Sequence, residues 1–147
     1  MVSDFTNWSE NSVHKGRVVI PAQYKAKFTA AARSTVVCTV GPDSSIAVYP
    51  LDAWLKLKQQ LQAGSEDDLD MLDELEDFKI IETLEGPGRI KLSDELLNFA
   101  NITDSVIIKG EGSYMTLWNP NVFQDSRAEK IAAFKDKKHS KRKFQVN

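Results

Sequence analysis

The most constraining feature of the sequence is that one order of features occurs twice. Residues 15–21, Lys-Gly-Arg-Val-Val-Ile-Pro, and residues 87–93, Pro-Gly-Arg-Ile-Lys-Leu-Ser, both place a Gly-Arg pair before alternating apolar residues. Alternation that follows a glycine turn predicts the second arm of a β-hairpin. A short helical stretch follows in each copy, beginning at Pro21 and at Ser93, which are residue types that suit the start of a helix.

Two further strands and a helix are predicted in each copy. The strands are rich in β-branched residues and are separated by a turn that contains glycine; they cover residues 36–40 and 46–50, then 106–109 and 115–119. The helix that follows is expected to stop at Gly64 as its C-cap in the first copy and to run from Val122 towards Phe134 in the second. This order predicts a duplicated, β-rich α+β protein.

The aromatic residues repeat as well. Tyr49 precedes Trp54 by five residues, and Trp118 precedes Phe123 by the same spacing. Because these side chains recur at corresponding places, we interpret them as packing residues of the core or of the contact between the two halves, rather than as platforms for base stacking.

An acidic segment lies between the two copies. Ser65 suits an N-cap, the carboxylates that follow it complement the helix dipole, and an apolar stripe recurs at helical spacing at Leu69, Leu72 and Leu75. The predicted organisation is therefore a first repeat over 1–63, an acidic helical connector over 64–77, a second repeat over 78–134 and a basic C-terminal tail over 135–147.

Composition limits the classes of function. With 147 residues, of which 41% are apolar, the chain can bury a core without disulfides or a structural metal. Cys38 is the only cysteine and the two histidines are far apart, so we expect a buried structural thiol, no metal site and no cofactor. No apolar stretch is long enough to span a bilayer, which predicts a cytoplasmic protein with no membrane partner.

The repeated pattern resembles the MraZ family of bacterial regulators. The resemblance extends from about Phe5 to about Phe123, and its most specific stretches are 15–21, 48–54 and 88–92. It implies that each half is an AbrB-like swapped-hairpin unit, that the two halves form a pseudo-dimeric β-barrel with peripheral helices, and that the protein assembles into a ring-like homo-oligomer. It also implies a nucleoid-associated repressor of the division and cell-wall gene cluster.

The chain departs from the Asp-x-x-x-Arg signature that this family carries in both copies. Val13 stands at the first acidic position and Glu85 at the second. An acid in such a turn can accept hydrogen bonds from the arginine four residues later and fix its direction. We therefore expect Glu85 to pair with Arg89, and Arg17 to be either free or held by another acid such as Glu10.

Lys15, Arg17 and Arg89 are the candidate DNA-binding residues. A two-stranded ribbon fits the major groove of double-stranded DNA, where the two arginines could contact guanine edges and Lys15 a phosphate. The basic run 135–143 is expected either to be a solvated extension or to add nonspecific phosphate contacts.

Two other functions remain as alternatives. An enzyme is not expected, because the sequence offers no catalytic residues in a recognisable arrangement and no phosphate-binding loop for a small-molecule substrate. An oligomeric protein-interaction module that has lost specific DNA binding is favoured by Val13 and by the net charge of −2. DNA binding requires that Lys15, Arg17 and Arg89 share one surface away from the acidic helix.

Overall fold

The computed structural model of the chain describes residues 7–25, 28 and 32–137. The first repeat contains two strands, a short helix, two strands joined by a 3-10 turn, and a helix: β1 (Trp8–His14), β2 (Arg17–Val19), α1 (Ala22–Lys25), β3 (Thr35–Val40), η1 (Pro42–Ser44), β4 (Ile46–Pro50) and α2 (Leu51–Gln62). After α3 (Glu66–Phe78) the order recurs as β5 (Ile80–Thr83), β6 (Arg89–Lys91), α4 (Asp94–Phe99), β7 (Ser105–Gly110), β8 (Met115–Trp118) and α5 (Pro120–Asp136).

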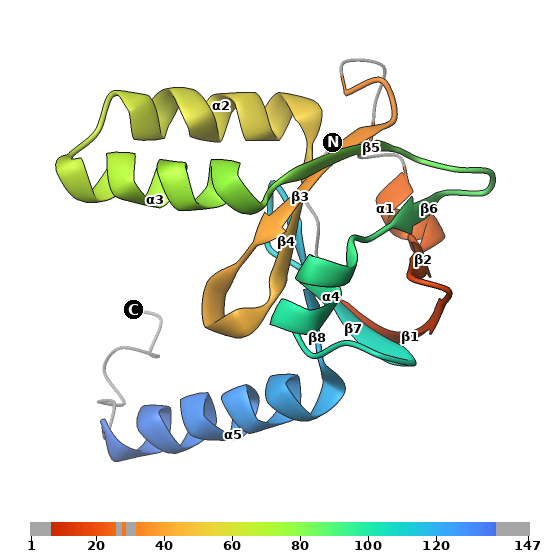
Figure 1. Cartoon of the computed structure of the whole chain (residues 1–147). Coiled ribbons are helices and arrows are strands. Elements are labelled where there is room, and N and C mark those ends of the chain that lie inside the picture. The colour runs from red at the N-terminus through yellow and green to blue at the C-terminus, as the bar shows by residue number, and fades with distance from the viewer. Residues whose placement is uncertain (1–6, 26–27, 29–31, 138–147) are drawn as a thin grey trace, which may run out of the picture.

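The eight strands form one antiparallel sheet in the order β5-β3-β4-β8-β7-β1-β2-β6. The two strands at the ends of this order, β5 and β6, are consecutive in the chain and are joined by a β-bridge between Glu85 and Arg89, so the sheet is a nearly closed barrel. The first strand of each repeat pairs with the third strand of the other, β1 with β7 and β5 with β3. This exchange confirms the swapped-hairpin fold expected from the sequence (Figure 1).

The strand register shows how closely the two halves correspond. Between β2 and β6, Val18 lies opposite Ile90, with Arg17 opposite Lys91 and Val19 opposite Arg89 on either side. Each repeat thus presents the same sequence positions to the other, and β4 and β8 pair in the same reciprocal manner around Ala47 and Thr116. The barrel has an approximate twofold relation between its halves, as a duplicated sequence predicts.

The interior of the barrel is apolar and draws on both repeats equally. Val18 and Ile90 are fully buried at the centre of the β2–β6 pair, and Val48 and Leu117 are fully buried on β4 and β8. Alternation places the neighbours of Val18 and Ile90 on the outer face, because successive side chains of a strand point to opposite sides. The outer face of β2 and β6 therefore carries Arg17, Arg89 and Lys91 together with the exposed Val19.

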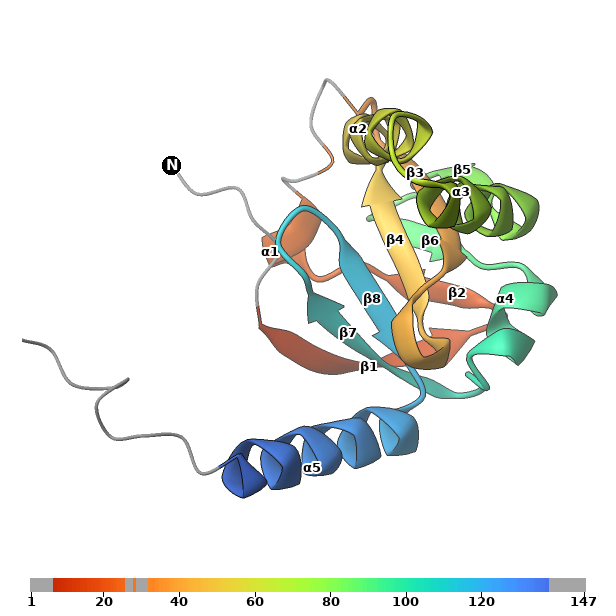
Figure 2. The same ribbon diagram turned by 90° about the vertical axis from the view of Figure 1, so that its left-hand side faces the viewer.

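Helices cover two separate parts of the barrel. Trp54 and Leu61 of α2 and Leu72 and Leu75 of α3 form a buried cluster with Val37 of β3. On the other side, Phe123 of α5 packs with Ile107 and Trp118. Figure 2 shows the α2–α3 pair and α5 on opposite sides of the barrel. Burial of Trp54, Trp118 and Phe123 confirms that these aromatics are packing residues.

Two helix details differ from the sequence-based expectation. Helix α2 ends at Gln62, and its C-cap is Ala63 rather than the predicted Gly64. Glycine is not needed there, because the φ of Ala63 is −92° and the backbone does not enter the left-handed region. In α3, Leu69 is 43% exposed, so only Leu72 and Leu75 of the predicted stripe reach the core. The predicted N-cap is confirmed, since Ser65 and Asp68 form a reciprocal capping box.

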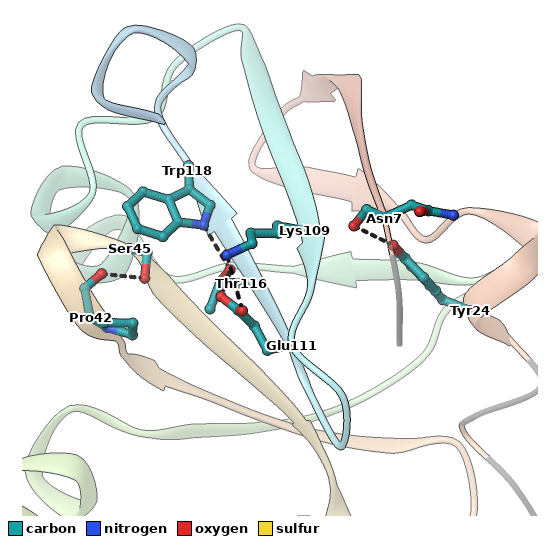
Figure 3. Close-up of polar contacts among 8 residues, drawn as sticks. All are labelled: Asn7, Tyr24, Pro42, Ser45, Lys109, Glu111, Thr116 and Trp118. Carbon is teal, nitrogen blue, oxygen red and sulfur yellow. Dashed lines mark hydrogen bonds and ion pairs between the residues drawn. The ribbon is translucent and has the colours of Figure 1, made fainter. Parts of the chain in front are cut away.

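Polar groups buried in the sheet have partners (Figure 3). The indole Nε1 of Trp118 donates to Oγ1 of Thr116 at 2.7 Å, and that hydroxyl donates to a carboxylate oxygen of Glu111 at 2.9 Å. Lys109 forms an ion pair with the other Glu111 oxygen at 3.2 Å. Since an unpartnered buried hydroxyl would cost stability, this chain of bonds allows Thr116 to be fully buried on β8.

The hairpin of α2 and α3 is joined by a three-residue ion-pair network. Glu76 of α3 accepts from Lys79 and lies 2.9 Å from the Nζ of Lys58 on α2. Hydrogen bonds from Lys79 and then Lys58 lower the pKa of the Glu76 carboxyl. Because the pKa of Glu76 is lower in the folded than in the unfolded state, its charge stabilises the fold at pH values above the ordinary carboxyl pKa. This contribution is lost as the pH falls through the folded-state pKa.

We expect Glu76→Gln to lower the free energy of unfolding at neutral pH by less than about 1 kcal/mol, because the pair is partly exposed. Urea titrations of both proteins between neutral and acidic pH measure this difference. It should begin to shrink as the pH falls to the ordinary carboxyl pKa of about 4.3, and it should reach zero only below the lower folded-state pKa, where Glu76 is protonated in both states. A difference that stays constant over the whole pH range would show that the charge of Glu76 is not its source.

Among the described helices, none has both the length and the apolar content needed to cross a membrane. Cys38 is fully buried in β3, and burial raises the pKa of its thiol, so it is a structural side chain as expected.

Candidate nucleic-acid interface

The first hairpin turn is a two-residue loop. His14 and Arg17 lie opposite each other at the ends of β1 and β2, which leaves Lys15 and Gly16 as the loop. Both have positive φ, +51° and +74°, the combination found in type I′ turns. Glycine adopts this conformation freely, whereas Lys15 does so at a cost of about 1–2 kcal/mol. The turn therefore presents a lysine at a position where Asn or Gly is preferred.

The second hairpin turn is one residue longer. Glu85 and Arg89 exchange backbone hydrogen bonds of 2.8 Å in both directions, and Gly86, Pro87 and Gly88 form the loop between them. Gly88 has a φ of +107°, a conformation that is essentially restricted to glycine. The longer loop changes which residues of the two turns correspond in space.

The difference in loop length explains why a valine, Val13, stands four residues before Arg17. Because His14 lies opposite Arg17 and Glu85 lies opposite Arg89, His14 is the spatial counterpart of Glu85. Val13 and Leu84 precede them, and both are partly buried against the core. Val13 therefore faces inwards and does not stand where an acid could meet the arginine.

The expected pairing of Glu85 with Arg89 is wrong, whereas Arg17 is held by another acid, as one of the two expectations had it, but that acid is not Glu10. Arg17 donates through Nε to Oε1 of Glu85 at 2.9 Å, so the arginine of the first repeat is held by the acid of the second. Glu10 lies on β1 opposite Ile107 of β7 and does not contact Arg17. The reason is topological: pairing of β2 with β6 brings the two turns side by side, which sequence spacing alone does not reveal.

Arg89 lies over its own turn. A Cβ added to Gly86 would be 3.2 Å from its Nη2, so the guanidinium packs against the Gly86 backbone. Within the part of the chain that the structure describes, the Arg89 side chain makes no ion pair or side-chain hydrogen bond. Its donors are therefore available to an incoming acceptor.

The three candidate residues converge on one open depression. His14, Lys15, Arg17, Glu85 and Arg89 line it, so three cations surround a single carboxylate. In Figure 1 both hairpin turns lie at the right-hand edge of the molecule, and the loop that joins α2 to α3 points to the opposite side. The arginines are thus not buried against the acidic helix.

Two further cations belong to the same face and were missed in the sequence. Lys91 lies opposite Arg17 in the β2–β6 pair and is exposed; the alternation Arg89-Ile90-Lys91 could have revealed it, because it places both cations on the outer face. The side chain of Lys25 in α1 packs over Gly88, because a Cβ added to this glycine would be 2.7 Å from the Cε of Lys25. Only the tertiary structure shows this contact.

The predicted basic tail is described only at its beginning. Lys135 and Asp136 form the end of α5, and Lys137 is its C-cap. Residues 138–143 of the predicted run lie outside the described residues. Among the residues that are described, no group of His, Cys, Asp and Glu side chains is arranged to hold a metal ion.

We expect Lys15→Asn to stabilise the fold and weaken DNA binding together. Asn tolerates the left-handed conformation of this turn, so the free energy of unfolding should rise by up to about 1 kcal/mol, while one cation is lost from the depression. Urea unfolding and DNA titration of the same preparation measure both effects. Unchanged stability would show that the turn conformation carries no strain, and unchanged DNA affinity would remove Lys15 from the interface.

The fold and the site define a duplicated swapped-hairpin barrel that presents the basic turns of both repeats on one face. The family model described as "MraZ protein, putative antitoxin-like" matches residues 14–74. The chain is 34% identical over 118 residues to "Transcriptional regulator MraZ" of Chlorobium luteolum, covering 72% of this chain and 76% of that protein. The chain belongs to the MraZ family.

Other relatives have the same name. The chain is 31% identical over 123 residues to the protein of Thermomicrobium roseum, covering 81% of this chain and 82% of the relative. It is 29% identical over 130 residues to that of Methylobacillus flagellatus, covering 85% and 86%. These matches include both repeats, since they span most of the chain.

Proposed function

We propose that this protein is a sequence-specific DNA-binding transcriptional regulator that acts through its two hairpin turns. The observation that carries the proposal is the convergence of Lys15, Arg17 and Arg89 on one open depression formed by both repeats. The relatives' name, transcriptional regulator, supports the same function. Lys15, Arg17 and Arg89 offer hydrogen-bond donors at this surface, and the Glu85 carboxylate offers an acceptor. Such groups suit the binding of nucleic acid.

The two turns supply different kinds of contact. A β-ribbon can enter the major groove, where an arginine can bond to guanine O6 and N7. Lys15, at the tip of the first turn, and Lys91, on the outer face of β6, are placed to meet phosphates. Phosphate contacts fix the register of the protein on DNA, and arginine contacts to base edges supply sequence preference.

The regulator acts as an oligomer in this proposal. One depression has few contacts, so a single copy would bind DNA weakly. A ring-like homo-oligomer that repeats the same surface can engage several repeated promoter sites, and the gain depends on how well the spacing of sites matches. The family resemblance indicates repression of the division and cell-wall gene cluster, at the nucleoid, as the cellular role.

A protein-interaction module is the second candidate. Glu85 lies inside the basic depression, and the chain carries a net charge of −2. A carboxylate among the cations weakens the attraction for phosphate and would suit a partner of mixed charge. This candidate predicts no preference for any DNA sequence.

Fluorescence anisotropy distinguishes the two. The protein is titrated into labelled DNA from upstream of its own operon and into scrambled DNA of equal length, at about 50 and about 200 mM salt. A regulator binds the upstream DNA saturably and prefers it at both salt concentrations. Equal weak binding to both DNAs that fades with salt would reduce the contact to nonspecific electrostatics and favour the interaction module.

A further inference from the structure

We propose that Glu85 is a positioning residue for DNA recognition: the carboxylate of the second repeat orients Arg17 of the first, so that the two turns read DNA as one unit. The inference rests on the proposed function. It arises from the 2.9 Å bond between Arg17 Nε and Glu85 Oε1, which joins residues 68 positions apart in the sequence.

The bond fixes which edge of the guanidinium is available. Arg17 has five N–H donors in a rigid plane. Nε donates to Glu85, and Nη1 lies 3.5 Å from the Lys15 carbonyl oxygen, which leaves three N–H groups at the Nη1–Nη2 end. A guanine that approaches Arg17 therefore meets the far end of a guanidinium whose plane is already set.

Stability gives little reason for this ion pair. The side chains of Arg17 and Glu85 are 33% and 43% exposed, and ion pairs with such exposure contribute little to folding. The cost of the same carboxylate to DNA binding is direct, because it lies among the cations that attract phosphate. An acid in this position favours DNA recognition if the orientation of Arg17 contributes more than the attraction for phosphate that the carboxylate removes.

Within the described ranges, only one of the two turn arginines is held in this way. His14 occupies the place that corresponds to Glu85, and Arg89 lies over Gly86 without an acidic partner. Arg89 can adjust to the DNA, whereas Arg17 is held before DNA arrives. Preorganised groups give better discrimination because less orientation has to be imposed during binding. The effect of Glu85 should therefore pass through Arg17 alone.

The test measures the affinity for upstream DNA divided by the affinity for scrambled DNA, which we call the specificity ratio. Glu85→Ala should lower this ratio about tenfold, within the discrimination that one bidentate arginine–guanine contact provides. Affinity for scrambled DNA should rise, since a negative charge is removed from the phosphate-facing surface. Glu85→Gln keeps an oxygen that can accept from Nε, so its specificity ratio should lie between those of Glu85→Ala and the unmodified protein.

A cycle of variants separates positioning from a general structural effect. In the Arg17→Ala background, Glu85→Ala should leave the specificity ratio unchanged, because there is no guanidinium to orient. In the Arg89→Ala background, it should lower the ratio as it does in the unmodified protein. Glu10→Ala is the matched control: like Glu85→Ala it removes one exposed carboxylate, but this one lies on β1 and does not contact Arg17.

Two results would overturn the inference while leaving the proposed function in place. One is an unchanged specificity ratio in Glu85→Ala; the other is an equal fall in the presence and absence of Arg17. If the unmodified protein shows no preference for the upstream DNA, the proposed function itself fails, and the inference with it. Thermal unfolding of each variant checks that the fold is retained.

Discussion

Replacing both Arg17 and Arg89 by alanine is expected to remove the preference for upstream DNA. Each bidentate contact between an arginine and guanine is worth about 1–3 kcal/mol of discrimination, so losing two should lower the specificity ratio at least about 30-fold. The fold should survive, because Arg89 is exposed and Arg17 makes only a partly exposed ion pair. Anisotropy titrations with upstream and scrambled DNA measure the effect.

Arg33→Ala combined with Arg127→Ala is a suitable control for the double variant. Both arginines are described and lie outside the depression, so the same number of charges is removed elsewhere. This control should lower affinity slightly for both DNAs without changing the specificity ratio. If the control and the hairpin variant behave alike, total charge rather than the turns determines DNA binding.

Replacing Ile90 by alanine is expected to give the largest loss of stability among these substitutions. Ile90 is fully buried opposite Val18 at the centre of the β2–β6 pair, where the two repeats meet. Removing such a side chain leaves a cavity and costs about 2–5 kcal/mol, a large share of the stability of an ordinary domain. Urea unfolding followed by tryptophan fluorescence gives the change in free energy.

Val19→Ala is the matched control for Ile90→Ala. Val19 lies on the same strand pair but points outwards and is 46% exposed, so its loss should cost about 0.5 kcal/mol or less. A loss below about 1 kcal/mol for Ile90→Ala would mean that the barrel tolerates a gap at the contact between repeats. The two hairpin turns would then not depend on tight packing for their relative position.

Local features of the fold were well predicted by the sequence. Alternation after Gly16 and Gly88 predicted β2 and β6, and Ser93 was correctly expected to cap the helix that follows. These features depend on neighbours in the chain, which periodicity and capping preferences describe directly. The exchange of strands between the repeats was expected only from the family resemblance, because a local sequence pattern does not indicate which strands pair with each other.

The details of the site depended on tertiary structure. The spacing of Glu85 and Arg89 suggested a pair within one turn, yet the β2–β6 contact gives Glu85 a nearer partner in Arg17. The first loop is one residue shorter than the second, so His14, and not the inward-facing Val13, corresponds to Glu85. An alignment that counts four residues back from each arginine does not show this difference. The proposed division into repeats, connector and tail remains a prediction at the level of its boundaries.

The central claim, that DNA meets the face formed by the two hairpin turns, is tested most directly by lysine acetylation footprinting. Mass spectrometry compares the acetylation of exposed lysines with and without upstream DNA. Lys15 and Lys91, on the proposed face, should become protected, while Lys56 of α2 and Lys130 of α5 should react as before. Protection confined to Lys130 and the basic C-terminal run, with Lys15 and Lys91 unchanged, would contradict the account.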